Sequence, residues 1–160
     1  MKFFKLNIFF LIFASLIFIS CENTSNRTSI PSAPVGIRLN LLHYPHLLSP
    51  FTSEYFTAVN PSIGVYAVGF GGVLISTFID SNSGNVLYAA FDMACPYEID
   101  RNTRVFPDES GIYAVCETCG SKFNLSFGLG QVAQKPANEN LRRFNTFKDG
   151  TFLRVEPRNY

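Results

Sequence analysis

The residues with the clearest capacity for chemistry are three cysteines in the second half of the chain. Cys116 and Cys119 form a Cys-x-x-Cys pair, and 20 residues separate them from Cys95 upstream. Two cysteines with this spacing at a tight turn can point both sulfur atoms into one small volume. Such a volume suits a soft metal ion, an iron–sulfur cluster or a reversible disulfide. The residue types and their spacing therefore predict a thiol-based site.

Two familiar arrangements of cysteines fit this spacing poorly. A four-thiolate zinc ribbon needs two Cys-x-x-Cys pairs, but Cys95 is followed by Pro-Tyr-Glu and has no second cysteine beside it. A thioredoxin-like motif places its pair at the start of a helix, whereas Gly120, Gly128 and Gly130 follow the pair here and argue against a helix. A zinc site would therefore need a fourth ligand from elsewhere in the chain.

The first part of the chain, residues 1–20, has the composition of a secretory signal peptide. Lys2 and Lys5 precede an apolar run over residues 8–19, which is shorter than the about 20 residues of a membrane-spanning helix. Cys21 follows a serine directly after this run, an order that resembles the lipobox of bacterial lipoproteins. The resemblance implies that Cys21 is acylated and anchors the protein to a membrane of the bacterial cell envelope, outside the cytoplasm. The alternative is an ordinary cleavage site that leaves a free cysteine.

The remainder of the chain is predicted to be a tether followed by one domain. Asn, Thr, Ser and Pro dominate residues 21–35, which we expect to be flexible, and residues 36–160 can bury one core but not two large ones. Without its two N-terminal lysines the chain carries 11 basic and 12 acidic residues. This balance argues against a nucleic-acid partner. Carboxylates around the first cysteine, Asp92 among them, are expected to be solvated rather than catalytic.

The domain is predicted to be all-β. β-branched and aromatic runs alternate with turn residues, and no apolar stripe of helical period persists for ten residues. The runs 65–70 and 73–79 are separated by two glycines and predict a β-hairpin. A strand-like run leads into a cysteine twice, over residues 86–95 and 112–116. This order favours a small antiparallel sandwich or barrel with two inserted loops that carry thiols.

The motifs around the cysteines resemble those of the Rieske family. Residues 95–97 read Cys-Pro-Tyr and residues 116–123 read Cys-Glu-Thr-Cys-Gly-Ser-Lys-Phe, where the family shows Cys-Pro-His and Cys-Pro-Cys-His-Gly-Ser-x-Phe. Downstream, Lys-Pro-Ala at residues 135–137 is similar to the family's Gly-Pro-Ala loop. With the order of strands, the resemblance extends over residues 38–155. It implies a Rieske-type β-sandwich or barrel.

The same resemblance implies a ligand set for a 2Fe–2S cluster. By position, Cys95 and Cys116 match the two thiolates on one iron, while Tyr97 and Cys119 stand where the family has the two histidines of the second iron. The implied ligands are three thiolates and one oxygen, from Tyr97 or Glu98. We expect a lower reduction potential than in a Rieske centre, because additional thiolate character favours the oxidised state.

The function that the resemblance implies is electron transfer to an unknown redox or envelope protein, with no catalysis by the domain alone. The alternative is a non-redox structural or interaction lipoprotein in which zinc or a disulfide joins the two loops. His43 or His46 could be the fourth ligand of such a zinc ion. A disulfide could link Cys95 to Cys116 or to Cys119.

Overall fold

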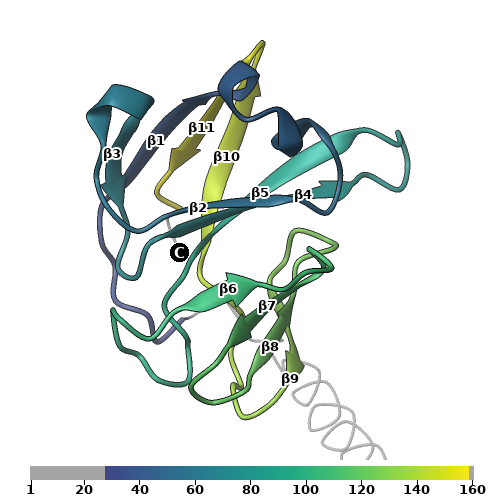
Figure 1. The fold of residues 1–160 in the computed structure, drawn as a ribbon. Helices are drawn as coiled ribbons and strands as arrows, with labels where there is room; N and C mark the ends of the chain where they lie inside the picture. The colour runs from purple at the N-terminus through teal and green to yellow at the C-terminus, as the bar shows by residue number, and fades with distance from the viewer. Residues whose placement is uncertain (1–27, 159–160) are drawn as a thin grey trace, which may run out of the picture.

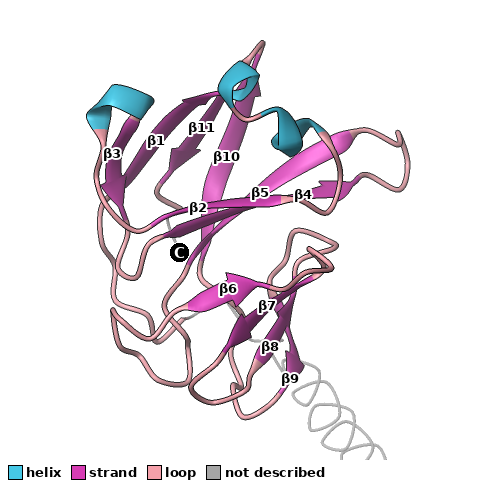
Figure 2. Cartoon of the chain, in the orientation of Figure 1, coloured by secondary structure: helices cyan, strands magenta, loops and turns pink. Residues whose placement is uncertain are grey.

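A computed structural model of the protein describes residues 28–158 (Figure 1). The strands are β1 (Val35–Asn40), β2 (Ser53–Phe56), β3 (Val65–Val68), β4 (Val73–Ile79), β5 (Val86–Asp92), β6 (Val105–Pro107), β7 (Tyr113–Cys116), β8 (Lys122–Asn124), β9 (Gln131–Gln134), β10 (Arg143–Asp149) and β11 (Phe152–Glu156). The short 3-10 helices are η1 (Leu41–His43), η2 (Pro45–Leu48) and η3 (Pro61–Ile63). The prediction of an all-β domain is confirmed (Figure 2). Within residues 28–158, no helix is long and apolar enough to cross a membrane.

The strands form two antiparallel sheets. The larger sheet has the order β2-β4-β5-β10-β11-β1-β3, and the smaller one has the order β6-β7-β8-β9. Strands β5 and β10 pair directly, so the small sheet is an insertion between them, and Figure 1 shows it beneath the large sheet. Phe56 on one edge strand of the large sheet and Val65 on the other lie in the same buried cluster. The large sheet therefore curls around one core, as a sandwich or partly closed barrel does.

Strands β4 and β5 separate this core from a second one. Val73, Ile75 and Ala90 lie in the first core, whereas Leu74 and Phe91 lie in the second. Successive side chains of a strand point to opposite faces, so the consecutive buried apolar residues Val73–Ile75 and Ala89–Phe91 reflect burial on both sides. The second core is completed by side chains of the small sheet and its loops.

The structure contradicts the predicted hairpin of residues 65–79. Strand β3 pairs with β1, whereas β4 pairs with β2 and β5. The turn between β3 and β4 is held by the carboxylate of Asp92, which accepts hydrogen bonds from the N–H groups of Phe70 at 2.7 Å, Gly71 at 2.9 Å and Ala94 at 2.9 Å. A Cβ on Gly71 would lie 2.4 Å from the nitrogen of Ala94. The two glycines thus allow close packing against the end of β5 rather than a hairpin turn.

Asp92 is not solvated, contrary to the sequence-based expectation. Its side chain is only 1% exposed. Burial raises the pKa of this carboxyl group above its ordinary value, although the three N–H groups and Arg142 act in the opposite direction. Asp92 is therefore a structural hydrogen-bond acceptor. Its carboxylate links the β3–β4 turn to the backbone of Ala94, directly before Cys95.

Two residues of the predicted tether contact the domain. Ile30 is 1% exposed, and its carbonyl oxygen accepts a hydrogen bond of 2.9 Å from Arg142. The backbone N–H and the hydroxyl of Ser29 both donate to Glu139, each at 2.7 Å. The division of the chain into signal peptide, tether and domain stays a prediction. The predicted signal peptide and Cys21 lie outside the described residues.

The role of Asp92 can be tested with Asp92→Asn. We expect a loss of about 1–3 kcal/mol in the free energy of unfolding, because an amide NH₂ cannot accept and leaves buried N–H groups without a partner. Urea denaturation of both proteins measures the difference. Asp149→Asn removes an exposed carboxylate at the end of β10 and is expected to change stability by less than about 0.5 kcal/mol. Equal stability of the two variants would contradict the assigned role.

Candidate metal centre

Cys95 lies in the loop that connects the large sheet to the small one. The loop is closed by backbone hydrogen bonds from Cys95 to the carbonyl of Thr103 at 3.0 Å and from Ile99 to the carbonyl of Cys95 at 2.9 Å. Ile99 has a φ of 53°, a left-handed conformation that strains a β-branched residue. The Cys95 loop is therefore a tight turn that the surrounding backbone holds in place.

Cys116 and Cys119 lie in the turn between β7 and β8. The Gly120 N–H donates to the carbonyl of Cys116 at 2.8 Å, and the Cys116 N–H donates to the carbonyl of Ser121 at 2.9 Å. Gly120 has a φ of +74°, which favours glycine at this position. Because β7 ends at Cys116, that thiol is buried in the second core, whereas Cys119 is displaced toward the surface.

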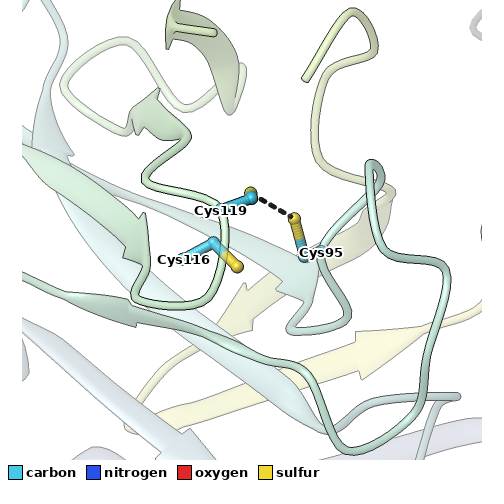
Figure 3. A group of neighbouring side chains, drawn as sticks. All are labelled: Cys95, Cys116 and Cys119. Carbon is cyan, nitrogen blue, oxygen red and sulfur yellow. Dashed lines mark hydrogen bonds between the residues drawn. The ribbon is translucent and has the colours of Figure 1, made fainter. Parts of the chain in front are cut away.

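The structure brings the three predicted cysteines together. Their sulfur atoms all lie within 4.8 Å of one another, and the sulfur atoms of Cys95 and Cys119 are 3.7 Å apart (Figure 3). Cys95 and Cys116 are fully buried, and Cys119 is partly exposed. Two sulfur ligands of one tetrahedral ion with bonds of about 2.3 Å lie about 3.8 Å apart. The convergence is thus close to what a single thiolate-bound ion requires, and metal binding itself stays a prediction.

The two loops give the thiols different acidities. Burial raises the pKa of Cys95 to about 12, although the backbone N–H groups of Tyr97 and Glu98 hydrogen-bond to its sulfur and act in the opposite direction. Burial also acts to raise the pKa of Cys119, but hydrogen bonds from Ser121, Cys116 and Cys95 together outweigh it, and that pKa lies below its ordinary value. Cys119 is therefore the more acidic of these two thiols, and a bound metal would compensate the charge of both.

Ser121 is a site residue that the predicted ligand set omits. It is fully buried, and its hydroxyl oxygen accepts a hydrogen bond of 2.9 Å from the N–H of Ala137. The hydroxyl proton is then free to be donated to the sulfur of Cys119, 3.1 Å away. The Gly-Ser sequence directly after the Cys-x-x-Cys pair could have indicated this residue. Its contact with Ala137 could not be predicted, because it depends on the tertiary fold.

The predicted fourth ligands do not join the cysteines. Among the described residues, the group of converging ligand atoms contains no histidine or carboxylate. His43 and His46 lie on η1 and η2, which bury Leu41 and Leu47 in the first core, on the other side of β4 and β5. The zinc ligation proposed for either histidine is therefore wrong.

His46 instead has a carboxylate neighbour of its own. Its Nε2 atom lies 3.1 Å from Glu54 Oε2. Near the thiols, Glu98 is half-buried and contributes no atom to the group. Tyr97 is 52% exposed, so its phenol would have to leave solvent in order to bind a metal.

The fold and the site together define a small antiparallel β-domain in which two loops bring three thiols together in one group. No family model matches the chain, and no curated protein matches its sequence. Among solved structures, the chain is similar to the plasma-membrane Rieske protein PetC3 of the cyanobacterium Synechocystis PCC 6803. The identity is 19% and the TM-score 0.45, over 78% of this chain and 98% of that one.

A second similar structure is the ferredoxin of carbazole 1,9a-dioxygenase from Nocardioides aromaticivorans IC177. The identity is 17% and the TM-score 0.46, over 79% of this chain and 100% of that one.

Ser121→Ala tests the hydrogen bond to Cys119. We expect the pKa of Cys119 to rise, because its thiolate loses a donor, and alkylation at neutral pH to become about threefold to tenfold slower. Iodoacetamide labelling of the metal-free protein over a range of pH, followed by peptide mass spectrometry, measures this change. Ser126→Ala removes a hydroxyl that bonds Asn124 instead and should leave the profile of Cys119 in place. An unchanged profile in Ser121→Ala would contradict the assignment.

Proposed function

We propose that the domain holds a metal centre on Cys95, Cys116 and Cys119 and transfers electrons through a 2Fe–2S cluster. The observation that carries the proposal is the convergence of three thiols from two loops within 4.8 Å. Two of these thiols are buried in an otherwise apolar core. Buried thiols without a metal are poor acids, whereas iron or zinc binds them as thiolates and compensates their charge.

The three thiols would supply three of the four ligands of a cluster. Cys95 and Cys116 would hold one iron, and Cys119 would hold the other together with an oxygen of Tyr97 or Glu98. That fourth ligand would have to move, because Tyr97 is 52% exposed and Glu98 contributes no atom to the converging group. A bound cluster would supply one-electron redox chemistry. Two backbone N–H groups directed at the sulfur of Cys95 would stabilise negative charge on it and so raise the reduction potential, whereas the third thiolate would lower it.

The partly exposed Cys119 supports a route for electrons to a partner. It is the member of the three-thiol group nearest to solvent, so a redox protein that docks over its turn would approach the centre most closely. We further propose that acylated Cys21 holds the domain on a membrane of the bacterial envelope. The partner would then be another envelope protein, and any transformation of a substrate would belong to that partner.

A single zinc ion is the second candidate, and one distance favours it. The sulfur atoms of Cys95 and Cys119 are 3.7 Å apart, close to the about 3.8 Å expected for two ligands of one tetrahedral ion. In the cluster assignment these two cysteines bind different irons. Zinc would join the two loops without redox chemistry, and the protein would be a structural or interaction lipoprotein.

Metal analysis of the protein purified anaerobically from an iron-replete host tests the cluster. We expect iron and acid-labile sulfide at about two each per chain, with a visible spectrum that dithionite bleaches. Cys95→Ser and Cys116→Ser should each abolish both. Glu117→Gln changes an exposed residue between the cysteines and should retain the full content. Colourless, iron-free protein would contradict electron transfer by this domain.

The zinc alternative predicts a different result in the same preparation. We expect about one equivalent of zinc, and removal by a chelator should lower the melting temperature, because the ion would join the two loops. Cobalt in place of zinc should show the visible bands of a tetrahedral thiolate site. Chelation that removes zinc without lowering the melting temperature would contradict a structural role.

A further inference from the structure

We propose that, in the metal-free protein, Cys119 and Cys95 are a reversible redox pair that exchanges with small disulfides. The inference concerns the thiols themselves and holds whether the resident metal is iron or zinc. Figure 3 shows the sulfur atoms of Cys119 and Cys95 facing each other across the two loops, at 3.7 Å. A disulfide bond is about 2.05 Å long. The distance between the two sulfur atoms must therefore shorten from 3.7 Å to this length before a bond can form.

Exposure assigns Cys119 as the attacking thiol. Cys95 and Cys116 are fully buried, whereas Cys119 is partly exposed. Of these three thiols, an external disulfide can therefore reach only Cys119. The hydroxyl of Ser121 lies 3.1 Å from its sulfur and can donate to the thiolate. A Cβ built on the neighbouring Gly120 would meet no atom within 4 Å, so the turn has open space into which it can shift.

The contact geometry assigns Cys95 as the resolving thiol. Cys116 ends β7, and hydrogen bonds to both its N–H and its carbonyl hold it in the turn. Its sulfur lies within 4.8 Å of both other sulfur atoms, whereas the sulfur atoms of Cys95 and Cys119 are in contact at 3.7 Å. A Cys95–Cys119 bond would join the two loops, whereas a Cys116–Cys119 bond would join residues of a single turn. The structure therefore favours the link between loops.

The exchange balances with one external disulfide. The Cys119 thiolate attacks one sulfur of that disulfide, so a mixed disulfide forms and one thiolate leaves. The Cys95 thiol then gives its proton to water and attacks the sulfur of Cys119, which releases the second thiolate. The two cysteines lose two electrons, and the external disulfide gains them and becomes two thiols. The reverse sequence reduces the pair.

Metal binding and this disulfide exclude each other, because both use the sulfurs of Cys95 and Cys119. A resident ion would protect the thiols from exchange, and oxidation would remove two of the three ligands. The pair would thus make metal retention dependent on the thiol–disulfide balance of the surroundings.

The test uses the full-length protein, stripped of metal under reducing conditions, then desalted anaerobically and treated with oxidised glutathione. Acid quenching, alkylation and peptide mapping identify the products. We expect a Cys95–Cys119 link with Cys116 alkylated, and its reversal by reduced glutathione. Cys95→Ser should instead accumulate glutathione on Cys119. Cys119→Ser should react at least about tenfold more slowly, because only buried thiols remain in the group.

Glu117→Gln is the matched control, since it changes an exposed residue of the same turn and leaves all three thiols in place. It should form the Cys95–Cys119 link at a rate within about twofold of the unmodified protein. Circular dichroism shows whether each variant is folded. Peptide mapping of the unmodified protein identifies the disulfide link even where a variant fails to fold. A Cys116–Cys119 link in the unmodified protein, or undiminished reaction of folded Cys119→Ser, would overturn the proposal. The metal content of the isolated protein decides the proposed function separately.

Discussion

Burial of strands β4 and β5 on both faces is the constraint on which the rest of the structure depends. Val73, Leu74 and Ile75 are all fully buried although successive side chains point in opposite directions. One face closes the core of the curled sheet, and the other needs a second layer, which the inserted small sheet provides. Because the Cys95 loop leaves the end of β5, that layer also determines where the first thiol lies.

Charge is the second determinant of what the site can do. The thiol of Cys95 lies in a core with Phe91, Phe123 and other apolar side chains, and this burial disfavours its thiolate. Among the described residues, hydrogen bonds to the sulfur atoms of Cys95 and Cys119 come from backbone N–H groups of the loops, from Ser121 and from the neighbouring thiols. This environment leaves the metal-free site largely protonated at Cys95. It also makes a metal cation the natural source of compensating charge.

The sequence was sufficient for the fold class and for the meeting of the cysteines, but not for the contacts between distant segments. The alternation of apolar runs and turns predicts antiparallel strands, and the spacing of Cys116 and Cys119 predicts a shared turn. The hairpin of residues 65–79 was wrong because local pattern does not reveal that β3 pairs with β1. Asp92 was assigned to solvent for the same reason, since its three N–H partners come from two segments separated by the length of β4 and β5.

The position of Cys119 connects the departures from the Rieske pattern with the chemistry that the site gains. A histidine at this position could bind iron, but it could not form a disulfide with Cys95. A thiol there, with its sulfur 3.7 Å from that of Cys95, can share one ion with Cys95 or form a covalent bond with it. The proposed metal centre and the proposed disulfide therefore use the same two sulfur atoms. Under these two proposals, a bound metal and the Cys95–Cys119 bond exclude each other.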